Sequence, residues 1–169
     1  MGRRLPQLAT AVAIAATVTP GSGSATEWKA GKSVDQMSGV ATTVISTTAV
    51  LPPAFKGRQL RARLAIQCEP KKPAALLADL GFPIARTSRG AARIKFDDAL
   101  PKSITGSPST DNQALFLPGA AALIQQIAKA KEFRVEVTAV TQQPVILAFS
   151  VAGLAEHAAD LATCGIKLK

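Results

Sequence analysis

The chain has no tyrosine, one histidine, two cysteines and one tryptophan among its 169 residues. Any Ser-His-Asp or Cys-His site would have to use that one histidine, His157. A zinc site needs three or four ligands, which one histidine and two cysteines expected to be bonded to each other do not supply. Aromatic residues make up only 4% of the chain, so the core must consist mainly of aliphatic side chains and alanine.

Other signatures of catalysis are missing as well. The sequence has no Gly-x-Ser-x-Gly nucleophile elbow and no Ser-x-x-Lys pair. Asp97 and Asp98 are adjacent, so along a strand their carboxylates would point to opposite faces, and we predict a charged turn there. His157 lies at the margin of an apolar helical stripe, a position typical of a structural histidine. We therefore predict a non-enzymatic protein with no catalytic residue, no cofactor and no metal ligand.

The first 25 residues have the pattern of a secretory signal peptide. A basic start at Arg3 and Arg4 is followed by an apolar run, residues 8–18, and then by small residues that end at Ala25. A membrane-spanning helix needs about 20 apolar residues, so the run is too short to be one. The alternative is a buried N-terminal helix. We predict cleavage after Ala25, a periplasmic or secreted protein, and one domain over residues 26–169.

Basic residues outnumber acidic ones and give a formal net charge of +9. Removing residues 1–25 removes two arginines and no acid, which leaves 9 − 2 = +7. This charge favours a surface for anionic lipid, polysaccharide or nucleic acid, and the alternative is a set of basic residues scattered over a solvated surface. The candidate anionic-ligand patch consists of residues predicted on outward strand faces: Arg61, Arg63, Arg93, Lys95 and Arg134.

Alternating or β-branched segments predict the strands. Residues 40–50 are rich in valine, isoleucine and threonine, and residues 60–68 alternate between apolar and polar, so the two segments are predicted to pair as a hairpin. The same alternation predicts further half-buried strands in residues 92–96, 133–139 and 145–151.

Two apolar stripes predict helices. One begins at Pro118, a favourable first helical residue, and the other follows Gly153. Residues 74–80 fit either a short helix or a strand, and residues 97–112 are predicted to be a loop because they are dense in turn residues. The fold class predicted is α+β: a small antiparallel sheet with two short helices, one after residue 117 and one at the C-terminus. The predicted stripes are Ala120, Leu123, Ile124, Ile127 and Ala128 in the first helix, and Leu154, Ala158 and Leu161 in the second.

The two cysteines are predicted to form one disulfide. Cys68 lies on the inward face of its strand, and Cys164 extends the apolar stripe of the last helix, three residues after Leu161. Paired cysteines are usual in an exported chain, and the alternative is two buried free thiols. Trp28 follows the predicted cleavage site closely, so we expect it to tie the N-terminus of the mature chain to the core.

These elements resemble the VasI-like periplasmic proteins associated with bacterial type VI secretion. The matching segments are Trp28 with residues 34–37, the strand that ends at Cys68, residues 92–97, and residues 149–164 with their Phe-x-x-x-Gly-Leu start and terminal cysteine. The resemblance implies an accessory periplasmic protein that has no catalytic residues. It implies a partner in the envelope or the secretion apparatus.

Three functions follow as hypotheses. The first is a non-enzymatic exported accessory or binding protein, associated with a type VI secretion system. The second is a cationic binder of anionic envelope polymers or nucleic acid. The third is a secreted inhibitor of a host or competitor enzyme, which would present the loop of residues 97–112.

Overall fold

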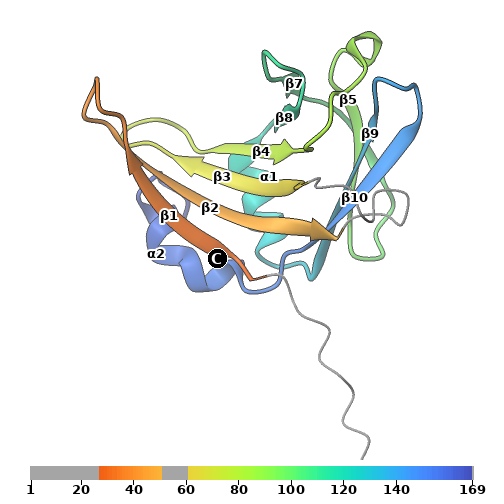
Figure 1. The fold of residues 1–169 in the computed structure, drawn as a ribbon. Helices are drawn as coiled ribbons and strands as arrows, with labels where there is room; N and C mark the ends of the chain where they lie inside the picture. Colours follow the sequence, from red (N-terminus) through yellow and green to blue (C-terminus); the bar gives the residue numbers. More distant parts are fainter. Residues whose placement is uncertain (1–26, 51–60, 169) are drawn as a thin grey trace, which may run out of the picture.

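The computed structural model describes residues 27–50 and 61–168 (Figure 1). The predicted signal peptide and its cleavage site lie outside the described residues. In the described part the chain forms ten strands, two α-helices and short 3₁₀ turns, which confirms the predicted α+β class. The strands are β1 Lys29–Val34, β2 Ala41–Val50, β3 Arg63–Cys68, β4 Ala75–Asp79, β5 Ala91–Phe96, β6 Lys102–Thr105, β7 Ser107–Pro108, β8 Ala114–Leu117, β9 Glu132–Thr138 and β10 Pro144–Ser150. The helices are α1 Ala120–Ile127 and α2 Ala158–Ala162, and the 3₁₀ turns are η2 Arg86–Ser88 and η3 Leu154–His157.

All strand pairs are antiparallel, and nine strands follow the order β6-β5-β9-β10-β2-β3-β4-β8-β7. The long strand β2 joins the two halves of this sheet. Its residues 41–46 pair with β1, whereas Ala49 and Val50 pair with β10 on the same edge. β6 and β7 lie at opposite ends of the order, yet only Gly106 separates them in the chain, so the sheet curls until it is nearly closed.

Two glycines make this corner possible. The Gly106 N–H donates a hydrogen bond of 2.9 Å to the carbonyl oxygen of Gly90. A Cβ atom on Gly90 would lie 2.1 Å from the Gly106 oxygen, and one on Gly106 would lie 2.6 Å from the Phe116 oxygen. Larger residues would therefore push the backbones apart where the chain crosses from β6 to β7.

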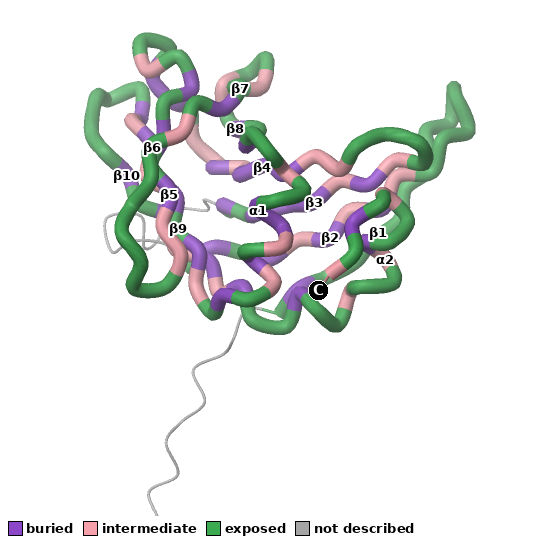
Figure 2. The backbone as a smooth tube through the Cα atoms, turned by 180° about the vertical axis from the view of Figure 1, so that it is seen from behind, coloured by how far each residue is buried: buried purple, intermediate pink, exposed green. Residues whose placement is uncertain are grey.

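The inward faces of the strands form an aliphatic core, as the composition predicts. Its only fully buried aromatic side chains among the described residues are Phe133 and Phe149, whose ring centres lie 6.5 Å apart. Figure 2 shows buried positions along the strands of the sheet, whereas many of the connecting loops are exposed. Alternation in β9 and β10 was predicted correctly, because these strands bury one face and expose the other. α1 adds Leu123, Ile124 and Ile127 to the core.

Several predicted elements were wrong in part. Residues 97–112 are not one loop, because they contain β6 and β7; this shortens the free segment on which the inhibitor hypothesis depends. α1 begins at Ala120 rather than at Pro118, because Gly119 precedes it with a left-handed φ of 65°. The last helix is divided into η3 and α2, and Ala158 is exposed although Leu154 and Leu161 are buried.

The strand content was predicted incompletely, and no strand was predicted where β8 lies. Residues 74–80, which fitted either a helix or a strand, contain β4. β1 was not predicted at all, because its six residues are exposed and show no apolar alternation.

Two contacts attach the ends of the described chain to the sheet. The predicted disulfide joins Cys68, at the end of β3, to Cys164, just after α2, with 5.1 Å between their Cα atoms. The Trp28 indole is buried, as expected, and its Nε1–H donates a hydrogen bond of 3.0 Å to the carbonyl oxygen of Val151. The segment after β10 is therefore held by two contacts, one from Trp28 near the start of the described chain and one from Cys68 at the end of β3.

We predict that Cys164→Ser lowers the free energy of unfolding by about 2–5 kcal/mol, because the disulfide closes a long loop in the unfolded chain. Urea denaturation followed by circular dichroism measures this change. Wild-type protein treated with reductant should unfold at nearly the same urea concentration as the variant. Equal midpoints for oxidised wild type and variant would contradict the prediction.

Candidate functional site

Three residues of the predicted basic patch meet on the outer face of the sheet. Arg93 and Lys95 lie on β5, and Lys95 pairs in register with Arg134 on β9. Together with Glu136 and Ile146 they line a hollow of about 110 Å³. The hollow is completed by Ile94 and Pro101.

Arg61 and Arg63 belong to a different part of the surface. Arg63 is in β3 and Arg61 precedes it, and the strands β10 and β2 lie between β3 and β9. Neither arginine lines the hollow around Lys95. The five predicted residues thus form a group of three and a separate pair.

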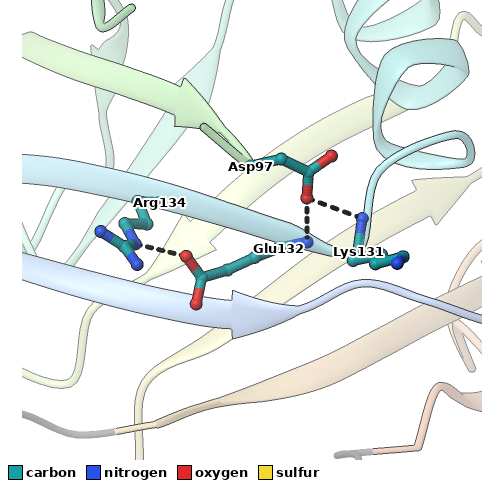
Figure 3. A network of polar contacts seen from close by, with 4 residues as sticks. All are labelled: Asp97, Lys131, Glu132 and Arg134. Carbon is teal, nitrogen blue, oxygen red and sulfur yellow. Dashed lines mark hydrogen bonds and ion pairs between the residues drawn. The ribbon is translucent and has the colours of Figure 1, made fainter. Parts of the chain in front are cut away.

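Carboxylates accompany most of these cations. Arg93 Nη1 lies 3.1 Å from Glu136 Oε1, Arg63 Nε lies 2.9 Å from Asp79 Oδ2, and the Arg134 guanidinium contacts Glu132 (Figure 3). Exposed ion pairs of this kind stabilise a fold by about 0–1 kcal/mol each. The ion pairs also neutralise most of the positive charge around the hollow. Within the described residues, Lys95 is the one cation of the hollow without an acidic partner.

A broader hollow of about 470 Å³ adjoins the first one on β5, β6 and β9. The Arg93–Glu136 pair belongs to the lining of both. Ser103, Thr105 and Thr138 add hydroxyl groups, and Ala91 contributes a small apolar side chain. Such a lining offers hydrogen bonds to a polar ligand over a rigid sheet.

The lone histidine lies in the C-terminal segment and lines neither hollow. His157 Nδ1 is 3.5 Å from Asp160 Oδ2, one turn further along the chain. Cys68 and Cys164 are bonded to each other, so no thiol of the described chain accompanies the imidazole.

Asp97 holds the end of β5 against the start of β9. Its Oδ1 accepts hydrogen bonds from the N–H groups of Lys131 and Glu132, at 2.9 and 2.8 Å, as Figure 3 shows. Its own N–H donates to the carbonyl oxygen of Glu132 at 3.0 Å. The residue has a positive φ of 43°, which aspartate tolerates better than most residues. This is the predicted charged turn.

The hairpin of β1 and β2 is a surface feature that the sequence reasoning missed. Its tip is an Asx-type turn in which Asp35 Oδ1 accepts hydrogen bonds from the N–H groups of Met37 and Ser38, at 3.0 and 2.7 Å. These bonds, led by the one from the Ser38 N–H, lower the pKa of Asp35 below its usual value. Val34 and Met37 are 60% and 97% exposed. The Asp-x-x-Ser-Gly segment between two valines was the signal available for this turn.

Among the described residues, no group of three or more acidic, histidine or cysteine side chains is placed to hold a metal ion, and no helix is long and apolar enough to cross a membrane. No known protein family, curated protein or solved structure matches the chain.

We predict that Asp97→Ala lowers the free energy of unfolding by about 1–3 kcal/mol, because two backbone N–H groups lose their acceptor and alanine disfavours positive φ. Asp97→Asn should retain most of the stability, since its amide oxygen still accepts these bonds. Asp98→Ala is the matched control and should change stability by no more than about 0.5 kcal/mol. Urea denaturation measures the free energy of unfolding of the three variants. If removing negative charge were the cause, Asp97→Asn and Asp98→Ala would lower this free energy as much as Asp97→Ala does, which would contradict a role of Asp97 in the turn.

Proposed function

We propose that this protein is a non-enzymatic exported binding protein of the bacterial envelope that serves as an accessory to a type VI secretion system. The observation that carries the proposal is the disulfide between Cys68 and Cys164, which fits an oxidising compartment such as the periplasm. The signal-peptide pattern of residues 1–25 points to the same compartment. The VasI-like resemblance supplies the link to secretion.

The surface supports binding better than chemistry. Arg93 and Arg134, which line the hollow around Lys95, each form an ion pair with a glutamate. Their charges are therefore largely neutralised within the surface of the sheet. The β1–β2 hairpin projects from one end of the molecule and exposes valine and methionine at its tip (Figure 1). An exposed apolar tip on a disulfide-bonded scaffold suits the recognition of another protein.

We predict that deleting the gene reduces type VI-dependent secretion in its own bacterium, measured as secreted effector in the culture medium. The wild-type gene should restore secretion. A gene that starts at a methionine placed before residue 26 should not, because its product lacks the export signal. Normal secretion in the deletion strain, or rescue by the version without the signal, would contradict the proposal.

Binding of an anionic envelope polymer is the second candidate, favoured by the hollow in which Lys95 has no acidic partner within the described chain. Arg93, Lys95 and Arg134 with Glu132 and Glu136 give this surface a net charge of 3 − 2 = +1. Such a charge favours weak binding that salt screens.

For this candidate we predict that Lys95→Glu weakens lipopolysaccharide binding several-fold at low salt. Lys167→Glu makes the same change in charge at another exposed position and should have little effect. Surface plasmon resonance on immobilised lipopolysaccharide measures both. Equal losses in the two variants, or no binding by wild type at low salt, would exclude a site at Lys95.

A further inference from the structure

The strand β1 is exposed to solvent along its whole length. All six of its residues are exposed, and within the described chain it pairs with β2 alone. Figure 2 shows it as an exposed stretch beside β2. Its second edge therefore presents N–H and C=O groups without a strand partner in that part of the chain, which makes it a template for a further strand. The edge is also held in place, because Trp28 is anchored just before it and the Asp35 turn closes its other end.

Gly31 lies inside β1, and nothing in the described fold requires a glycine there. Its φ is outside the left-handed region, and a Cβ atom added to it would meet no atom within 4 Å. Glycine weakens a strand interior, and it often marks a position where another chain approaches closely. An exposed strand glycine is covered well by an aromatic side chain on the neighbouring strand. Gly31 is thus a place for an aromatic residue of a partner.

Lys29 and Lys32 define the charge of this edge. They are three residues apart in a strand, so their side chains point to opposite faces. Neither makes an ion pair with a described residue. Lysines on an edge strand oppose pairing with a positively charged strand, including β1 of a second copy. They favour an added strand that carries one carboxylate on each face.

We infer that β1 binds an extended acidic segment of a partner protein as an additional strand of the sheet. In antiparallel pairing the partner segment reads acidic, aromatic, any residue, acidic. Its acidic residues lie opposite Lys32 and Lys29, and its aromatic residue covers Gly31. This inference rests on the proposed function for the protein nature of the partner, and it adds the site and the chemistry that the site recognises.

The test uses isotope-labelled mature protein and capped octapeptides, with binding followed by amide chemical shifts. The probe peptide has the sequence Thr-Val-Glu-Phe-Val-Glu-Val-Thr. It should shift the amide signals of residues 29–34. A peptide of the same composition in which Phe is exchanged with the first Val no longer covers Gly31 in either strand orientation and should bind about threefold to fivefold more weakly. The same probe with both glutamates replaced by lysine should not bind.

Two sets of variants make the test independent of folding effects. In Lys29→Glu/Lys32→Glu the preference should reverse, so that the lysine peptide binds and the glutamate peptide does not. Gly31→Thr should keep the fold, because the site is open, and should abolish the difference between the two phenylalanine positions. Shifts centred on Arg93 and Lys95, an unchanged preference in the charge-reversed variant, or a dimer of wild type through β1 would overturn the inference. The binding test uses purified protein and does not depend on secretion. The secretion phenotype of the deletion strain therefore tests the proposed function separately.

Discussion

The disulfide between Cys68 and Cys164 is the constraint on which the rest of the structure depends. β3 lies in the half of the sheet that contains β4 and β8, whereas the C-terminal segment follows β10 in the other half. The bond therefore links the half of the sheet that contains β3 to the C-terminal segment, which follows β10 in the other half. Trp28 adds a hydrogen bond to the same segment at Val151, so the start of the described chain is held there too.

Closure at the opposite side has a different physical origin. The chain crosses from β6 to β7 at Gly106, where the backbone of Gly90 approaches too closely for any side chain. Together with β2, which pairs in both halves, this crossing curls the sheet around an aliphatic core. The result is a rigid support from which the β1–β2 hairpin projects (Figure 1).

Strands that bury one face were predictable from the sequence, because burial imposes a period of two on β5, β9 and β10. β6, β7 and β1 were not. β6 and β7 are short and rich in turn residues, and pairing with β5 and β8 holds them in the sheet. β1 buries neither face, so it leaves no apolar pattern in the sequence.

The candidate site shows the same limit. The outward direction of Arg93 and Arg134 follows from alternation, and the structure agrees with it. Their acidic partners depend on strand register, which places Glu136 opposite Arg93, and on side-chain contacts within β9, and neither can be read from one sequence. The disulfide was predictable because the signal-peptide pattern and the inward-facing positions of both cysteines favoured it.

We propose that this domain is exported and is closed by the disulfide between Cys68 and Cys164. Peptide mapping by mass spectrometry tests it most directly, on protein isolated from the periplasm without reductant. We expect one linked pair of peptides that contains Cys68 and Cys164 and is separated only by reductant, and we expect no free thiol. Two free thiols in that protein would contradict it.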